Sequence, residues 1–131
     1  MTRRALHLDR LEPRQLLANY GNPWPDGSRL TLSFAPEATD LVGLPSTLYG
    51  TLDASLPRTQ WQSAIARALQ TWAVHTDVNI GFRADGGQAF GTTGFKLNDP
   101  RFGDVRIGSH EMTSDVLAVS VPYDPARAGT L

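Results

Sequence analysis

The chain of 131 residues has no cysteine and no long apolar run, and each absence excludes a class of protein. Without cysteine it can form no disulfide, no thiolate zinc site and no cysteine nucleophile, so any metal ligands would be histidine, aspartate or glutamate. The longest uninterrupted apolar stretch, residues 116–119, is far shorter than the roughly 20 residues that a helix needs to cross a bilayer. We therefore expect no membrane span.

Lysine is almost absent as well, and the remaining charges are scattered. Lys96 is the only lysine among twelve basic residues, and thirteen acidic residues bring the formal net charge to −1. No basic face suited to a phosphate backbone is visible, so nucleic acid is not an expected partner. Many aspartates lie in turn-rich segments and could bind calcium. Since no dense D-x-D-x-D loop occurs, turn formation explains them more simply.

The chain divides into a short N-terminal module and a single domain. Residues 1–18 are rich in arginine and leucine and precede a break of proline, glycine and asparagine. Residues 19–131 are long enough for one hydrophobic core and too short for two. The module has no apolar stretch of the length that an ordinary signal peptide requires, so its composition alone favours a short amphipathic surface helix.

One segment of this module resembles a known export tag. The string Leu11-Glu12-Pro13-Arg14-Gln15-Leu16-Leu17-Ala18 is similar to the LExRxLLA tag at the start of many exported bacterial surface proteins. The resemblance implies export to the surface or the exterior of a bacterium, with processing near Ala18. We therefore interpret residues 1–18 as an export and processing tag.

Two segments of the domain alternate apolar and polar residues with the period of two that a half-buried strand requires. The apolar positions are Leu30, Leu32 and Phe34 in the first segment and Val78, Ile80 and Phe82 in the second. Short strands are also predicted at residues 104–107 and 116–121. The last of these is almost continuously apolar, so we expect it to be covered on both faces. Residues 37–58 and 84–103 are predicted to be loops.

A helix is predicted over residues 59–75, between the two alternating segments, because apolar residues recur there on one helical face. These residues are Trp61, Ile65, Ala68, Leu69 and Trp72. Thr59 and Gln62 fit a capping box at the helix start. Strand, helix and strand in this order indicate a βαβ unit with two parallel strands. Burial of the helix face predicts a loss of roughly 3–5 kcal/mol for Trp72→Ala.

The three histidines form no local metal-binding pattern. They lie at positions 7, 75 and 110, without an H-x-H pair or an i, i+4 pair. His75 suits the negative end of the predicted helix, and His110, beside Glu111, is interpreted as a surface residue, although a ligand role for either stays open. Ser109 precedes His110 without an evident acid partner or a G-x-S-x-G turn, which argues against a serine hydrolase. Nucleotide-binding glycine motifs are also absent.

Several short segments of the domain form an ordered series. The segments are Trp24-Pro25, Leu30-Thr31-Leu32-Ser33-Phe34, Ile65-Ala66-Arg67-Ala68-Leu69-Gln70-Thr71-Trp72, Val78-Asn79-Ile80-Gly81-Phe82, Gly103-Asp104-Val105-Arg106-Ile107-Gly108 and Val116-Leu117-Ala118 before Pro122. Taken in this order, they resemble the opening of a matrixin-type zinc metallopeptidase domain, a member of the metzincins, and order and spacing agree over residues 24–131. Each segment is a weak signal, and their common order carries the resemblance.

The resemblance implies a mixed α/β (α+β) fold, the incomplete upper subdomain of a metzincin. Such a subdomain has a twisted, mostly parallel sheet, a long backing helix and an antiparallel edge strand. In this family the edge strand pairs with an extended polypeptide substrate through main-chain hydrogen bonds. Val116, Leu117 and Ala118 occupy the matching positions and are the candidate substrate-binding residues. From the residues alone, they could equally be core residues of a strand.

Two parts of the family pattern are missing from this sequence. Val119 stands where vertebrate-type members have a histidine that binds a structural zinc, so that second zinc is not expected. The downstream motif H-E-x-x-H-x-x-G-x-x-H, which holds the catalytic zinc and the general base, does not occur. We therefore predict no catalytic and no metal-binding residues in this chain, and zinc only in a full-length protein.

The prediction is thus an export tag in residues 1–18 and, in residues 19–131, the N-terminal part of a matrixin-like domain that stops before the zinc-binding helix. In the full-length protein it would belong to a zinc-dependent endopeptidase acting on extended polypeptide outside a bacterial cell. Alone, it should be a monomer and catalytically inactive. The alternative is a non-catalytic adhesion or binding module on the same scaffold.

Overall fold

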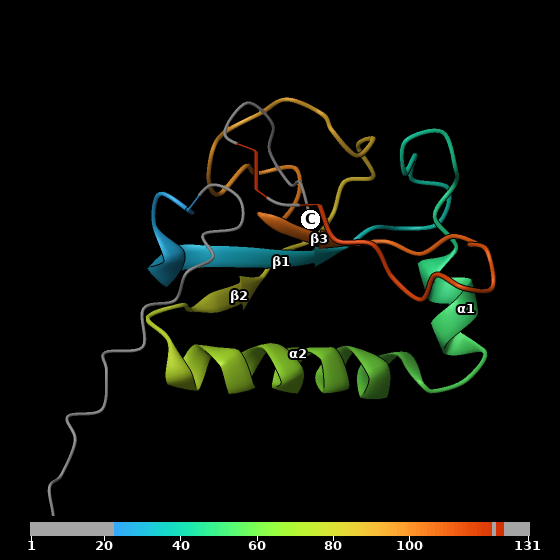
Figure 1. The fold of residues 1–131 in the computed structure, drawn as a ribbon, viewed down its shortest axis with the longest axis horizontal. Helices are drawn as coiled ribbons and strands as arrows, with labels where there is room; N and C mark the ends of the chain where they lie inside the picture. Colours follow the sequence, from blue (N-terminus) through green and yellow to red (C-terminus); the bar gives the residue numbers. More distant parts are fainter. Residues whose placement is uncertain (1–22, 122, 125–131) are drawn as a thin grey trace, which may run out of the picture.

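A three-stranded parallel sheet forms the centre of the fold (Figure 1). The computed structural model describes residues 23–121 and 123–124, and the tag predicted for residues 1–18 lies outside the described residues. The elements in chain order are the 3-10 helix η1 (Gly27–Arg29), β1 (Leu30–Phe34), α1 (Leu48–Asp53), α2 (Arg58–His75), β2 (Ile80–Phe82) and β3 (Val105–Ile107). The strand order is β2-β1-β3, so the expected mixed α/β class is confirmed.

The predicted strand-helix-strand unit is present. β1 pairs in parallel with β2, with Leu32 opposite Phe82, and the chain between these strands contains α1 and α2. β3 pairs in parallel with the other side of β1, with Leu32 opposite Val105. Helix α1 lies within residues 37–58, which the sequence predicted to be a loop. Its six residues are too few for a clear helical period, and Leu48 anchors it in the core.

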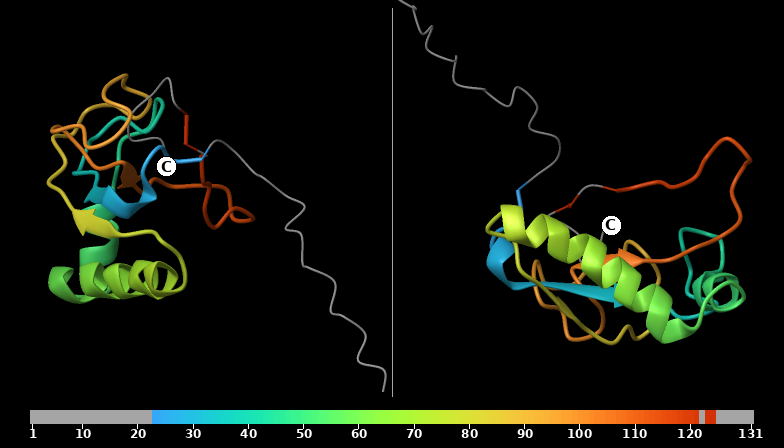
Figure 2. Two further views of the ribbon diagram at one scale, coloured as in Figure 1. Left: turned by 90° about the vertical axis from the view of Figure 1, so that its left-hand side faces the viewer. Right: turned by 90° about the horizontal axis from the view of Figure 1, so that it is seen from below.

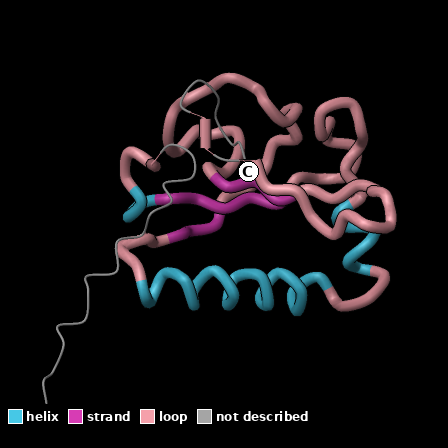
Figure 3. The backbone as a smooth tube through the Cα atoms, viewed as in Figure 1, coloured by secondary structure: helices cyan, strands magenta, loops and turns pink. Residues whose placement is uncertain are grey.

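The two faces of the sheet are covered by different kinds of structure (Figures 1 and 3). Helix α2 runs across one face, where Leu32 and Phe34 of β1 pack with Leu48 and Trp61 in a buried cluster. Residues 84–103 form a long irregular excursion over the other face, and Figure 2 shows both layers from two further directions. The apolar side chains of β1 therefore face the helices, while Ser33 faces the loop, where it hydrogen-bonds Asp85.

The excursion comes so close to β1 that it needs a glycine. A methyl group on Gly103 would lie 2.5 Å from the main-chain nitrogen of Ser33 and 2.7 Å from the carbonyl carbon of Leu32. Such contacts are not tolerated between unbonded atoms, so the absence of a side chain sets how closely the end of the loop packs on the sheet. By contrast, a Cβ added to Gly81 of β2 would meet no atom within 4 Å.

Helix α2 begins one residue earlier than predicted and without a capping box. Its N-cap is Pro57, and no side chain caps the first turn, so the proposed Thr59–Gln62 box is wrong. The physical reason is the conformation of Pro57, whose φ is −53° and whose ψ is 139°. Because this ψ is extended rather than helical, Pro57 stays outside the helix, and Arg58 is the first helical residue.

Helix α2 is buried along a slightly different face from the one predicted. Trp61 is 3% exposed, but Trp72 is 72% exposed and Ala68 is also exposed. Ile65 and Leu69 pack against the core, and the sheet-facing side continues through half-buried positions toward β2. Trp72 lies at the edge of that face, so the predicted large loss for Trp72→Ala was based on a wrong orientation.

The strand predicted for residues 116–121 does not form. This segment has no regular secondary structure, and Leu117 is 98% exposed. Its main chain finds no neighbouring strand in the described part of the chain, and without a ladder partner β-propensity alone does not create a strand. The described residues accordingly contain three parallel strands and no antiparallel edge strand.

The two tryptophans of α2 give a direct test of this packing. Trp61→Ala should lower the free energy of unfolding by about 3–5 kcal/mol, because it removes a buried ring. That ring meets Phe34 edge-on at 5.1 Å between centroids and donates from Nε1 to Asp53 over 2.8 Å. Trp72→Ala should change stability little, since its ring lies mostly in solvent. Urea unfolding of both variants measures the difference, and equal losses would contradict the described orientation of α2.

Candidate functional site

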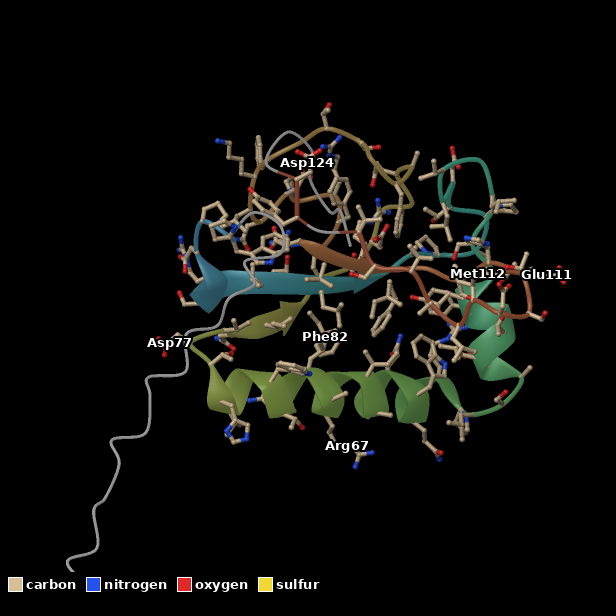
Figure 4. All side chains as sticks on the ribbon, in the orientation of Figure 1. Arg67, Asp77, Phe82, Glu111, Met112 and Asp124 are labelled. Carbon is tan, nitrogen blue, oxygen red and sulfur yellow. The ribbon has the colours of Figure 1, made fainter. Side chains whose placement is uncertain are left out.

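The candidate substrate-binding residues lie on an exposed excursion that follows β3. Residues 108–121 run from β3 toward α1 and then return toward the sheet, and Figure 4 shows Glu111 and Met112 near α1. The main-chain nitrogen of Thr47, the N-cap of α1, donates to the carbonyl of Ser109 over 2.6 Å. At the other end, Tyr123 is buried and packs against Trp24, with 4.2 Å between ring centroids and the two rings tilted by 31°. The excursion is therefore fixed at the N-cap of α1 near its start and is followed by a residue that packs on Trp24.

Val116, Leu117 and Ala118 are held at their N-terminal side by a turn. The amide of Val116 donates to the carbonyl of Thr113 over 3.0 Å, and the Thr113 hydroxyl lowers the pKa of Asp115 by hydrogen bonding to its carboxylate. From residue 117 to residue 121, no main-chain hydrogen bond is formed within the described part of the chain. This segment therefore presents free donors and acceptors next to apolar side chains.

The two described histidines do not meet. His75 is the last residue of α2, as predicted, and it is exposed. His110 lies beyond β3, where its Nδ1 is 2.7 Å from the carbonyl oxygen of Glu111. Within residues 23–121 and 123–124, no three histidine, aspartate or glutamate side chains come together in a way that could hold a metal ion. The described residues therefore do not fit a zinc site.

The most organised polar cluster lies between the loop and the sheet, around Arg106 of β3. The Arg106–Asp85 pair is enclosed, with side chains 0% and 1% exposed. Two donors of the guanidinium reach the two carboxylate oxygens at 2.9 and 2.8 Å, and one of them also donates to the carbonyl of Gln88 at 2.8 Å. The rings of Phe90 and Phe102 lie 4.4 and 4.6 Å from the guanidinium carbon. The cation is thus enclosed by acceptors and aromatic faces.

The Asp85 carboxylate is saturated by donors from three parts of the chain. Besides Arg106, it accepts from the Ser33 hydroxyl at 2.6 Å and from the amide of Gly87 at 2.9 Å. Ser33 in turn accepts from the amide of Gly103 at 2.9 Å. This network connects β1, β3 and both ends of the loop. The sequence analysis missed it, and the only available signal was that Arg106 alternates with Val105 and Ile107, which places it on the face opposite the helices.

Two other aspartates of this region, Asp99 and Asp104, also accept several hydrogen bonds that hold the loop. Asp104 accepts from the amide and hydroxyl of Thr31 at 2.8 and 2.7 Å, and from the amide of Asn98 at 2.6 Å. Asp99 accepts from the amides of Phe95 and Arg101, each at 3.0 Å. The predicted turn-forming role is therefore present, although Asp99 and Asp104 are buried rather than solvated.

Comparison with known proteins adds no relationship. No family model, no curated protein and no solved structure matches this chain significantly. Within the described ranges, neither helix has the length and apolar character needed to cross a bilayer.

Removal of the buried cation tests the importance of the polar cluster. Arg106→Met should lower the free energy of unfolding by about 3–5 kcal/mol, because the Asp85 carboxylate would stay buried without its counter-charge. Arg29→Met is the matched control, since Arg29 pairs with Asp26 on the surface and its loss should leave stability nearly unchanged. Equal urea midpoints for the two variants would show that the pair is not enclosed as described.

The Asp99 carboxylate predicts a specific dependence of stability on pH. The Arg101 guanidinium, with donors 2.9 and 2.8 Å from the two carboxylate oxygens, holds the pKa of Asp99 well below its usual range. A carboxyl whose pKa is lowered by folding stabilises the protein above its unfolded pKa of about 4. That stabilisation is lost as the pH falls toward the folded value.

We therefore expect Asp99→Asn to be less stable than the parent chain at pH 7, with the gap narrowing progressively below about pH 4. Urea unfolding between pH 7 and pH 2 measures it. Asp77→Asn is the control, because Asp77 is exposed in the turn between α2 and β2 and forms no ion pair in the described structure (Figure 4). A gap between D99N and the parent that stays constant with pH would contradict the role given to Asp99.

Proposed function

We propose that this chain is the N-terminal part of an exported zinc-dependent endopeptidase domain of the matrixin type, acting on extended polypeptide. The observation that carries the proposal is the order of the matching segments in residues 24–131. The parallel β1-α2-β2 arrangement, with β3 on the other side of β1, supports it, because the family has a mostly parallel sheet backed by a long helix. Fold alone would not indicate an activity.

The proposed contribution of this chain is to hold the substrate, through Val116, Leu117 and Ala118. A strand of substrate can add to a protein segment only where main-chain donors and acceptors are free. Residues 117–121 satisfy this condition within the described structure, and their neighbours are fixed through Ser109 and Tyr123. Peptide binding would give this irregular segment the extended geometry of a strand, at the entropic cost of fixing its main chain.

Zinc would be held outside the residues described here. In the proposed family, the histidine motif that binds zinc comes after the segments found in this chain, and the described His75 and His110 are not part of any three-ligand group. We therefore assign no step of peptide hydrolysis to residues of this chain. Its proposed work is to bind and orient an extended peptide beside the metal-binding part of the domain.

The coding sequence beyond Leu131 and the metal affinity of the chain test this proposal together. We expect an in-frame H-E-x-x-H-x-x-G-x-x-H motif downstream, and no tight stoichiometric zinc site in the 131-residue chain when zinc binding is measured by titration calorimetry. A stop codon directly after Leu131, with a soluble and well-folded chain, would favour the binding module instead. Nanomolar zinc binding that is lost on His75→Ala or His110→Ala would overturn the ligand assignment.

If the longer protein is a peptidase, Leu117→Pro should reduce kcat/KM for peptide cleavage at least about tenfold, because proline removes a main-chain donor and restricts the segment. Leu117→Ala, which keeps the main chain, is the control and should have a much smaller effect. Similar losses in both variants would show that the side chain, rather than the main chain, of this segment matters.

A further inference from the structure

We propose that the groove between α2 and the carboxyl ends of β1 and β2 is a binding site for a ligand with an aromatic or apolar body and a single carboxylate. The groove has a volume of about 510 Å³, within the size range of small-molecule sites. It is separate from the proposed peptide-binding segment, because its lining comes from residues 34–85 and includes none of residues 108–121.

The walls of the groove are partly aromatic. Phe34 closes one side, Tyr49 of α1 another, and Phe82 at the end of β2 a third. Phe82 is 58% exposed, and Figure 4 shows it between β2 and α2. The Tyr49 hydroxyl donates to the carbonyl of Phe34 over 3.4 Å, and burial raises its pKa, so it stays neutral. These rings give a flat apolar ligand a surface to stack on.

Arg83 supplies a cation without a partner to this groove. It directly follows β2, and its amide donates to the carbonyl of Leu32 over 2.8 Å, which fixes its main chain. Its Nε is buried and has no hydrogen-bond acceptor in the described structure. The four arginines at positions 29, 58, 101 and 106 each pair with an aspartate, so a guanidinium that is partly buried and unpaired is a departure from the rest of the molecule.

The nearest acidic residue of the lining does not compensate this charge. Asp85 also borders the groove, but both of its oxygens are taken by Arg106, Ser33 and Gly87. The groove therefore has an excess of one positive charge. Buried polar groups almost always have partners, and a guanidinium pairs best with a planar carboxylate, which can accept two of its donors at once. An incoming carboxylate would complete the arrangement.

Helix α2 adds neutral donors on the opposite side of the groove. Thr59, Gln62 and Ser63 lie on one face of its first two turns, and their side chains make no hydrogen bond within the described residues. The first turn of α2 contains no acidic residue and no side-chain cap, and the nearby Asp53 carboxylate is already paired with Arg58 and Trp61. Donors on both sides and aromatic rings between them favour an aromatic carboxylate over a bare inorganic anion.

Titration of the full 131-residue chain with phenylacetate tests the proposal, with phenylacetamide as the uncharged analogue and inorganic phosphate as the anion without an apolar body. Binding is measured by two-dimensional NMR. We expect phenylacetate to bind saturably and to shift the amide signals of Thr59, Gln62, Ser63 and Phe82. Phenylacetamide and phosphate should bind at least about tenfold more weakly. Equal binding of phenylacetate and either comparison compound, or no saturable binding, would overturn the proposal.

Variants locate the charge that recognises the ligand. Arg83→Gln should weaken phenylacetate binding about ten- to one-hundred-fold, since it removes charge-assisted hydrogen bonds. Arg67→Gln is the matched control and should bind normally, because Arg67 points away from the sheet on the outer side of α2 (Figure 4).

Should R83Q fail to fold, Ser63→Glu tests the same point from the exposed helix face, because its carboxylate would compete for Arg83. Unchanged affinity in R83Q, or in S63E, would contradict the site.

A carboxylate of this kind can come from a small aromatic acid or from the C-terminal end of a peptide. Titration with Gly-Gly-Phe and with its C-terminal amide separates the two sources. Tighter binding of the free acid peptide than of phenylacetate would identify a peptide end as the ligand, whereas tighter binding of phenylacetate would identify a small acid. Equal binding of the peptide acid and its amide would contradict recognition of a carboxylate.

Discussion

The enclosed Arg106–Asp85 pair is the constraint on which the loop side of this molecule depends. Two charges can be buried only if nearly all of their donors and acceptors find partners, because an unsatisfied buried charge is far more costly than a hydrogen bond is favourable. Here the partners come from β1 through Ser33, from the loop through Gly87 and Gln88, and from the rings of Phe90 and Phe102. Because all of these contacts must form together, they fix the positions of both ends of the loop.

The opposite face of the sheet is held by apolar packing, and this difference explains how much the sequence could predict. Burial of one side of a strand or helix leaves a period of two or of about 3.6 in the sequence, so β1, α2 and the parallel unit with β2 were predictable. A polar pair leaves no period. Asp85 and Arg106 are 21 positions apart, and nothing in either neighbourhood indicates that they meet.

The errors in prediction have physical causes of the same kind. Trp72 was assigned to the buried face because it is apolar at a helical spacing, yet the packed face is centred on Ile65 and Leu69. Residues 116–121 have the composition of a strand, but a strand also needs a partner, and none lies beside them in the described structure. The candidate groove was not predictable at all, because Tyr49 of α1, Ser63 of α2 and Arg83 after β2 are far apart in the sequence and only the fold brings them together.

The missing side chain at Gly103 has a consequence for how this scaffold could vary. Where the loop returns to the sheet, the Cα of Gly103 lies so close to β1 that no side chain fits. The hydrogen bonds of Asp104 to Thr31 and of Arg106 to Asp85 then hold the loop at this distance from β1. Farther from the sheet, the side chains of Lys96 and Phe95 are exposed, and the contacts there are the main-chain hydrogen bonds of Thr93 and Phe95 to Arg101 and Asp99. Changes of sequence at the exposed positions of the loop that keep these main-chain bonds should therefore be tolerated better than any change at residues 103–106.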